Sequence, residues 1–331
     1  MIRVQESQRL AAIRRLVNQS GDRDASARRL IAAAPAHGID LDLLWASLST
    51  AGAISQSCLA VLGAGRTAMT FLSEPGPEGD ADPRSAAVER ASCLDAACRE
   101  LAHHSGKVGT GVMMAQGLPD PGESWSIEAY KRAGFTHVGD LSYLRRAISG
   151  FPTTPEPTWP AGIRVVPFHK CFGDDGRERL AELLARTYEG TLDCPELCGL
   201  RDPIDVADSH MATGVFDPSL WLIVLNHDKA EGCVLLSRNP ELRGVELVYF
   251  GFAPALRGKG MALPLLQYAV GRTRAPSVLE LTCAVDDRNE PAKKLYERAG
   301  MRRYSGRVAF VRPLRAGVGA VEERASRSPG V

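Results

Sequence analysis

A glycine-containing turn in the second half of the chain has the composition of an anion-binding loop. The segment FAPALRGKGMA, residues 252–262, is expected to join the end of a strand to the start of a helix. Successive backbone N–H groups at a helix start can bind phosphate oxygens, and Gly258 and Gly260 would let the backbone approach such a ligand closely. Arg257 and Lys259 add positive charge. By itself, the segment fits either a phosphate-binding loop or a solvated glycine-rich turn.

A second segment, NEPAKKLYERAG, has the signature of a short capped helix over residues 289–299. Asn289 is a typical N-cap residue, Pro291 suits the first turn, and Gly300 suits the position just past the C-terminus. The expected buried stripe consists of Ala292, Leu295 and Ala299. Tyr296 follows one turn after Ala292 on an adjacent face, where a tyrosine is either a packing residue or a catalyst.

Together and in this order, the two segments resemble the GNAT superfamily of acyl-CoA N-acyltransferases, over residues 163–314. The resemblance implies that acetyl-CoA is the cosubstrate. Its pantetheine arm would pair with the strand edge at Phe250, Gly251 and Phe252, and Asn289 would contact it from the second helix. Tyr296 would protonate the departing thiolate. The amides expected to hold the pyrophosphate are those of Arg257, Gly258, Lys259, Gly260, Met261 and Ala262.

The resemblance also assigns a role to Glu246, six residues before Phe252. In the histone-acetylating branch of the family, a glutamate at the matching position is the general base, directly or through water. In a regular strand, Glu246, Val248, Phe250 and Phe252 share one face, and an acidic residue on that apolar face needs a partner or a task. The alternative is an edge carboxylate that faces water. Pro264 departs from the family pattern, and we expect the helix to start near Gly260 and to tolerate it in the first turn.

The chain divides at a proline-rich segment, SGFPTTPEPTWPAG, which cannot continue a helix or a central strand. We expect a first domain over residues 1–148, a linker over 149–162, a second domain over 163–314 and a flexible tail over 315–331. Hydrophobic periodicity predicts the elements within each domain. In the first half, helices are expected at 7–16, 23–33, 84–103 and 123–133, and strands at 58–62, 67–73, 108–115 and 135–145. In the second half, strands are expected at 163–168, 220–225, 232–236, 245–252, 278–285 and 302–311, and helices at 177–188, 259–272 and 289–299.

The two halves read as a diverged repeat. GRTAMTFLSEP (residues 65–75) parallels GVELVYFGFAP (residues 244–254), and SIEAYKRAGF (126–135) parallels AKKLYERAGM (292–301), with Tyr130 opposite Tyr296. The predicted fold class is therefore α/β (α+β), with two GNAT-like domains, each a mixed, mostly antiparallel twisted sheet flanked by helices. The first half lacks the cofactor loop, because four carboxylates occupy residues 74–82 and Thr67 replaces Glu246. We interpret it as a degenerate domain that supports the second, with Tyr130 as a packing residue.

The segment expected to form the acceptor wall, residues 188–217, is acidic. Seven carboxylates there oppose Arg201 and His210: Glu189, Asp193, Glu196, Asp202, Asp205, Asp208 and Asp217. An acidic lip would attract a small-molecule amine or a basic peptide, whereas the alternative is a solvated loop with helix-capping aspartates. Cys194 and Cys198 lie near His210 but lack the paired C-x₂-C spacing of zinc sites, and no metal is predicted.

Composition excludes several other classes. The 331 residues carry a net charge of +1, so no bulk electrostatic attraction to nucleic acid or membrane is expected. The N-terminal segment has no apolar run, and eight cysteines are too sparse for a disulfide scaffold, so a cytoplasmic location is expected. The sequence predicts an N-acetyltransferase that works by direct attack in a ternary complex, with Glu246 as base and Tyr296 as acid. The rival is a non-catalytic acyl-CoA-binding or regulatory GNAT-like protein.

Overall fold

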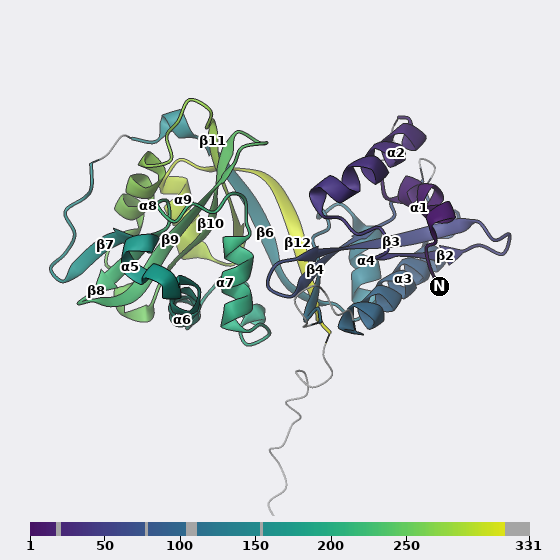
Figure 1. Ribbon diagram of the computed structural model, residues 1–331, viewed down its shortest axis with the longest axis horizontal. Helices are drawn as coiled ribbons and strands as arrows, with labels where there is room; N and C mark the ends of the chain where they lie inside the picture. The colour runs from purple at the N-terminus through teal and green to yellow at the C-terminus, as the bar shows by residue number, and fades with distance from the viewer. Residues whose placement is uncertain (18–20, 77–78, 104–110, 153–154, 315–331) are drawn as a thin grey trace, which may run out of the picture.

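The computed structural model describes residues 1–17, 21–76, 79–103, 111–152 and 155–314 (Figure 1). The tail predicted at residues 315–331 lies outside the described residues. So do the first residues of the strand predicted at 108–115. No helix in the described part of the chain is long and apolar enough to cross a membrane.

The first half begins with helices and continues as a mixed sheet. Its helices are α1 (Arg9–Leu16), α2 (Arg23–Ala33), α3 (Pro83–His103) and α4 (Ser124–Arg132). Its strands are β1 (Ile2–Arg3), β2 (Leu44–Leu48), β3 (Ile54–Gly63), β4 (Thr67–Leu72), β5 (Met114–Gly117) and β6 (Thr136–Ala147). The four predicted helices are confirmed. Two strands, β1 and β2, were not predicted.

The second half follows the predicted order of strands and helices. Its strands are β7 (Ile163–Pro167), β8 (Leu222–Asn226), β9 (Lys229–Asn239), β10 (Gly244–Phe252), β11 (Glu280–Asp286) and β12 (Arg302–Pro313). Its helices are α5 (Phe168–Phe172), α6 (Gly176–Tyr188), α7 (Pro203–Met211), α8 (Ala262–Gly271) and α9 (Glu290–Arg298), with 3-10 turns η5 (Pro195–Leu197) and η6 (Pro254–Leu256). Helix α7 was not predicted and lies within the acidic segment.

The halves share one twelve-stranded sheet because each half places its last strand in the other. The strand order is β1-β2-β3-β4-β5-β12-β6-β11-β10-β9-β8-β7. Strand β6 of the first half pairs with β11, and β12 of the second half pairs with β5 as well as with β6. Figure 1 shows these two long strands bridging the halves. The two predicted GNAT-like domains therefore share one continuous sheet, and β6 of the first domain pairs with β11 and β12 of the second.

Helices cover both faces of the sheet in each half, because the strand residues alternate between two apolar cores. In the second half, α8 and α9 pack on one face around Leu266, and α6 and α7 pack on the other around Leu184. In the first half, α3 and α4 cover one face and α1 and α2 the other. A small fifth core lies where the strands are exchanged, around Val138 and Ala309.

The predicted repeat is visible in matching local geometry. Helices α4 and α9 each end in the same hydrogen-bonded motif, with a glycine of positive φ just past the helix: Gly134 at 73° and Gly300 at 72°. In α4 the N–H of Phe135 donates to the carbonyl of Tyr130, and in α9 the N–H of Met301 donates to the carbonyl of Tyr296. The two tyrosines therefore occupy equivalent positions.

Candidate active site

A cavity of about 280 Å³ opens where two parallel strands separate. Strands β10 and β11 pair only over their first residues, from Gly244 opposite Glu280 to Glu246 opposite Thr282. Beyond Glu246 the strands splay apart, and residues 247–252 of β10 line the cavity together with Ala284 and Val285 of β11. The edge of β10 that faces the cavity has no strand partner there, so it can accept an extended ligand as an added strand.

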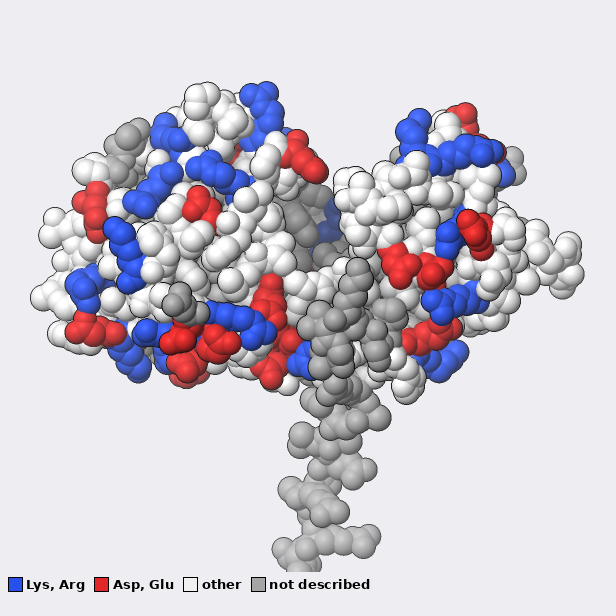
Figure 2. All heavy atoms as spheres, viewed as in Figure 1, with Lys and Arg blue, Asp and Glu red and all other residues white. Residues whose placement is uncertain are grey.

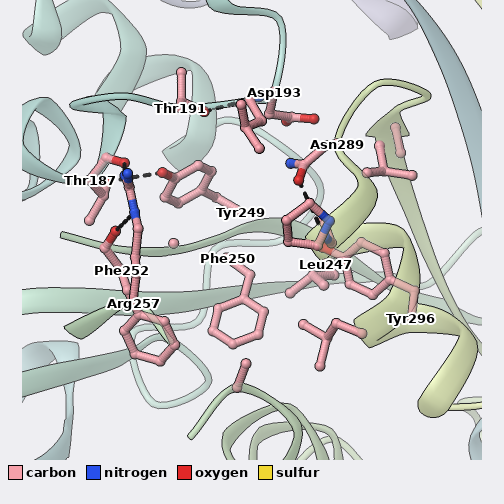
Figure 3. Close-up of a pocket in the computed structure, with 18 of the residues that line it drawn as sticks. Thr187, Thr191, Asp193, Leu247, Tyr249, Phe250, Phe252, Arg257, Asn289 and Tyr296 are labelled. Atoms are coloured by element: carbon pink, nitrogen blue, oxygen red, sulfur yellow. Dashed lines mark hydrogen bonds between the residues drawn. The ribbon is translucent and has the colours of Figure 1, made fainter. Parts of the chain in front are cut away.

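A β-bulge at Val248 re-aims the side chains of β10. The register with β9 shifts between Leu247 and Tyr249, which leaves Val248 as the extra residue. Consequently, Phe250 and Phe252 pack in the core beneath α8, whereas Val248 and Tyr249 pack in the core beneath α6. Figure 3 shows Tyr249 pointing away from the two phenylalanines. The predicted shared face of Glu246 with Phe250 and Phe252 is therefore wrong, because a bulge inverts the alternation.

Tyr296 is brought into the cavity by α9. Its side chain is 6% exposed and lines the cavity opposite β10. Its hydroxyl has no hydrogen-bond partner among the described residues, which is unusual for a buried tyrosine. Burial raises its pKa well above the ordinary range. The phenol is therefore protonated at neutral pH and is free to donate to a bound molecule.

Asn289 caps α9 at the edge of the same cavity. Its side-chain oxygen accepts a hydrogen bond from the N–H of Ala292 at 3.2 Å, as predicted for an N-cap. Asn289, Pro291, Ala292 and Leu295 all line the cavity with Tyr296. The first turn of α9 thus forms one wall of the cavity.

The predicted phosphate loop joins η6 to α8 and exposes its backbone. Gly258 and Gly260 both have a φ of 74°, a conformation that favours glycine. The loop is exposed from Arg257 to Gly260. Within the described part of the chain, no acceptor is paired with the backbone N–H groups of Gly258, Lys259, Gly260, Met261 and Ala262. This run of free donors at the start of α8 suits an anionic ligand.

The side chain of Arg257 has a different task from the predicted one. Its guanidinium donates to the carbonyls of Phe252 at 2.9 Å, Thr187 at 2.9 Å and Gly190 at 3.2 Å (Figure 3). It therefore ties the loop to the C-terminal end of α6 and is not directed at a ligand. Lys259 is exposed and has no recorded ion pair with a described residue, so it is the side chain that remains available for a phosphate.

Helix α8 begins at Ala262, two residues later than predicted. Met261 is its N-cap, and Pro264 is its third residue. Since the N–H groups of the first turn have no intrahelical acceptor, the missing N–H of Pro264 costs little there. The expectation that the helix tolerates this proline is confirmed.

Glu246 lies beside the cavity and not in its lining. It is half-buried and alternates with Val245 and Leu247, so it points to the α6 and α7 face, where Tyr249 also points. Its carboxylate has no hydrogen bond or ion pair with any described residue, and desolvation raises its pKa. An unpaired carboxylate of this kind retains basic character near neutrality.

The wall formed by α6 and α7, to which Arg257 ties the phosphate loop, contains residues that sequence reasoning missed. The Tyr249 hydroxyl donates to Thr187 Oγ1 at 2.9 Å, and the Tyr188 hydroxyl lies 3.2 Å from His210 Nε2. The His210 ring stacks on Tyr249 with centroids 5.5 Å apart. Packing of the imidazole and the nearby charge of Arg201 lower the pKa of His210 to about 4. No local sequence signal points to this wall, because Tyr188 is the only Phe, Tyr or Trp residue between Phe172 and Phe216.

Helix α7 carries His210 and is fixed by the first half of the chain. Arg66, in the turn between β3 and β4, makes a bidentate ion pair with Asp205, with N···O distances of 2.6 to 2.9 Å. Ser209 Oγ donates to the carbonyl of Ala64 at 2.9 Å. The first half thus positions the acceptor wall directly, in addition to exchanging a strand.

The predicted acidic lip is mostly neutralised. Glu196, Asp205 and Asp208 pair with arginines, and Asp202 and Asp217 cap turns. Acidic and basic groups accordingly lie side by side around α6 and α7 (Figure 2). Asp193 and Glu189 neither pair with a basic residue nor cap a turn among the described residues. Of the two, only Asp193 lines the cavity.

Among the described residues of the first half, Tyr130 fills the space that corresponds to the cavity. Its hydroxyl donates to the carbonyl of Thr70 at 2.7 Å, and its ring packs against the backbone of β5 at Gly117. Strand β4 pairs with β3 without a register shift, so it lacks the bulge of β10. In the loop after β4, Asp80 pairs with the buried Arg90. The packing role predicted for Tyr130 agrees with this geometry.

A metal role finds no geometric support at the cysteines. Cys194 is buried and Cys198 is exposed, and both are free thiols. Within the residues that the structure describes, no three histidine, cysteine or acidic side chains form a group that could hold a metal ion.

Comparison with known proteins agrees with this geometry. Residues 179–301 match the model of the acetyltransferase (GNAT) family. A stretch of 89 residues is 34% identical to mycothiol acetyltransferase of Beutenbergia cavernae; it covers 26% of this chain and only 29% of that protein. The fold is similar to a GCN5-related N-acetyltransferase from Sphaerobacter thermophilus, with a TM-score of 0.57 and 18% identity over 95% of this chain and 93% of that one. A tandem GNAT protein from the clavulanic acid biosynthesis pathway gives a TM-score of 0.45 at 15% identity over 83% of each chain.

The matched residues include the elements that line the cavity, which are the C-terminal end of α6, the loop after it, β10, the start of α8, β11 and α9. The second half of the chain therefore contains a region, residues 179–301, that matches the acetyltransferase (GNAT) family.

Proposed function

We propose that the protein is an acetyl-CoA-dependent N-acetyltransferase that acylates a primary amine of a small molecule or a basic peptide. The observation that carries this proposal is Tyr296, whose side chain is buried and lines the cavity and whose hydroxyl has no hydrogen-bond partner among the described residues. GNAT-family proteins use acyl-CoA, and mycothiol acetyltransferase is by its name an acetyltransferase. Acetyl is the acyl group that this proposal assigns.

The phosphate loop, residues 257–262, supports a site for the pyrophosphate of CoA. The N–H groups of residues 258–262 would donate to phosphate oxygens, and the start of the α8 dipole would add attraction. Lys259 would contribute its charge from the exposed side of the loop. The pantetheine arm would run along the unpaired edge of β10, from Phe252 towards Leu247, which brings the thioester to the depth of Tyr296.

The chemistry is a direct transfer within a ternary complex. The neutral amine attacks the thioester carbon, an N–C bond forms, and the C–S bond breaks. The phenol of Tyr296 donates a proton to the departing sulfur. The proton lost by the amine nitrogen passes to Glu246 through water, because Glu246 lies beside the cavity and not in its lining. A backbone N–H near Phe250 would polarise the thioester carbonyl. No covalent enzyme intermediate is required.

The experiment is calorimetry with CoA and acetyl-CoA, followed by release of the CoA thiol with a panel of amines, polyamines, aminoglycosides and basic peptides. We expect binding of both nucleotides and acceptor-dependent thiol release. Absence of CoA binding would contradict the assigned site. Binding without turnover over the whole panel would favour a non-catalytic acyl-CoA-binding or regulatory protein.

A further inference from the structure

We propose that Asp193 binds a positively charged group of the acceptor and so selects amines that carry a second positive charge. The proposal rests on the proposed function, because it concerns the acceptor of the same reaction. It starts from Asp193, the only carboxylate among the described residues that line the cavity.

The charge balance of the cavity favours a cation. Among its lining residues in the described chain, only Asp193 and Arg257 are charged. All three nitrogens of the Arg257 guanidinium donate to backbone carbonyls. The guanidinium of Arg257 is therefore held by backbone carbonyls beside the phosphate loop. Asp193 would face the space that the acceptor occupies. A positively charged group on the acceptor would pair with it.

The carboxylate of Asp193 is held in place by the backbone N–H of Asp286 and lies beside the Asn289 side chain. Its Oδ1 accepts a hydrogen bond from the N–H of Asp286 at 2.9 Å, and its own N–H donates to Thr191 Oγ1 at 3.1 Å. The side chain of Asn289 lies close enough to the carboxylate to lower its pKa by hydrogen bonding. Loss of hydration raises its pKa, which makes pairing with a cation more favourable. The groups that face it are Asp286, Arg288 and Asn289.

The loop that carries Asp193 is built under strain and clamped. Cys194 has a φ of 43°, in the left-handed region, and its N–H donates to Asp286 Oδ2 at 3.0 Å. Asp286 is fully buried and pairs with Arg288 at 2.7 Å. A residue persists in a strained conformation only where the surroundings fix it. The clamp between the end of β11 and this loop therefore sets the position of Asp193.

The exchanged strands support the same loop from behind. Leu197 and Leu200, which follow Asp193, pack on the small core formed by Met114, Val138 and Ala309 of β5, β6 and β12. Since β5 and β6 belong to the first half, that half contributes to the acceptor side of the cavity.

Tyr296 gives an independent indication that a ligand occupies this space. Its side chain is buried, its hydroxyl has no partner among the described residues, and it lines the same cavity as Asp193 from a different element. An acceptor that fills the cavity would place its reacting amine near the thioester at Tyr296 and its second charge at Asp193. The expected class of acceptor is thus a diamine, or an amine with a nearby ammonium or guanidinium group.

The test compares matched acceptors that differ only in charge. For several chain lengths, an α,ω-diamine such as 1,4-diaminobutane is compared with the amino alcohol of equal length, with thiol release as the readout. For at least one length, we expect kcat/KM to favour the diamine by about ten-fold or more, the value of one charge-assisted hydrogen bond. Asp193→Asn, which keeps the shape and the oxygen facing Asp286, should remove most of this preference and leave acetyl-CoA affinity unchanged.

Glu189→Gln is the matched control, because Glu189 lies on the same loop, is exposed and does not line the cavity. It should keep the full preference for the diamine. Equal use of diamines and amino alcohols by the wild type, or a preference that survives Asp193→Asn, would overturn the assignment of Asp193 while leaving the transferase intact.

A second readout does not depend on turnover. We expect the preferred diamine to bind, by calorimetry, to the protein preloaded with CoA, and to bind about ten-fold more weakly to Asp193→Asn. Absence of diamine binding to the CoA-loaded wild type would overturn the inference. Absence of acetyl transfer to every amine, with diamine binding intact, would contradict the proposed function alone.

Discussion

Tyr130 and Tyr296 occupy equivalent positions in the two halves, but only Tyr130 has its hydroxyl satisfied. Tyr130 donates to the carbonyl of Thr70 at 2.7 Å, whereas the Tyr296 hydroxyl has no partner among the described residues. Strand β10 separates from β11 beyond Glu246 and carries a bulge at Val248, and a cavity lies between β10 and β11. Strand β4 has no such bulge, so the tyrosine closes the space itself.

The first prediction uses this pair of residues. Tyr296→Phe should lower kcat by about ten-fold or more, because a general acid contributes at least that much. The dissociation constant of acetyl-CoA should hardly change. Tyr130→Phe should leave kcat intact and cost about 1 kcal/mol of stability through the lost hydrogen bond. Unaltered turnover in Tyr296→Phe would remove this residue from the mechanism.

The second prediction concerns the base. The raised pKa of Glu246 means that its basic form is lost at a higher pH than the ordinary value of about 4.3. Glu246→Gln should reduce kcat/KM by about 100-fold. It should also abolish the decrease of kcat/KM at low pH that protonation of Glu246 causes in the wild type. The ratio of wild-type to variant profiles, measured with one acceptor, cancels the ionisation of the amine. A constant ratio across pH would show that Glu246 does not titrate in the reaction.

The third prediction concerns the phosphate loop. Gly260→Ala forces an alanine to a φ of 74°, which costs about 1–2 kcal/mol and should weaken CoA binding by about ten-fold. Gly271→Ala, in α8, is the control, because an added Cβ there meets no atom within 4 Å and needs no positive φ. Calorimetry with CoA measures both. Equal affinities of the two variants for CoA would argue against binding of CoA by the backbone N–H groups of this loop.

The fourth prediction concerns the contact between the halves. Arg66→Met leaves the buried Asp205 without its bidentate partner and should destabilise the protein by about 2–4 kcal/mol. Arg164→Ala removes an exposed pair with Asp228 and should cost less than about 1 kcal/mol. Urea denaturation followed by fluorescence compares them. If the two variants unfold at the same urea concentration, Arg66 does not fix α7.

The fifth prediction concerns acid stability. The pKa of His210 is about 4 in the folded protein and about 6.5 in the unfolded chain. Because the folded pKa is the lower one, its contribution is fully present above pH 6.5 and is lost as the pH falls towards 4. At most about 3 kcal/mol is at stake. In His210→Gln, the melting temperature should decrease less than in the wild type as the pH is lowered over this interval. An equal decrease in both proteins would show that other groups cause it.

Much of the site could be predicted because its signals are local. Asn289, Gly300 and the glycines at 258 and 260 act within one or two turns of chain, and each has the predicted capping or turn geometry. The helical stripe of α6, from Leu180 to Thr187, is buried as its spacing predicts. Asp193 and His210 were not singled out, since an acidic loop and an isolated histidine have no distinguishing spacing.

The sequence by itself determined the elements, the repeat and the positions of Tyr296 and the phosphate loop, because these depend on residues that are close together in the chain. Only the tertiary structure decided the exchange of β6 and β12, the bulge that turns Phe250 away from Glu246, and the clamp of Asp286 on the loop of Asp193. These features depend on hydrogen bonds between segments up to about half the chain apart. No local pattern of side chains encodes such pairings, since a strand presents the same backbone groups to any partner.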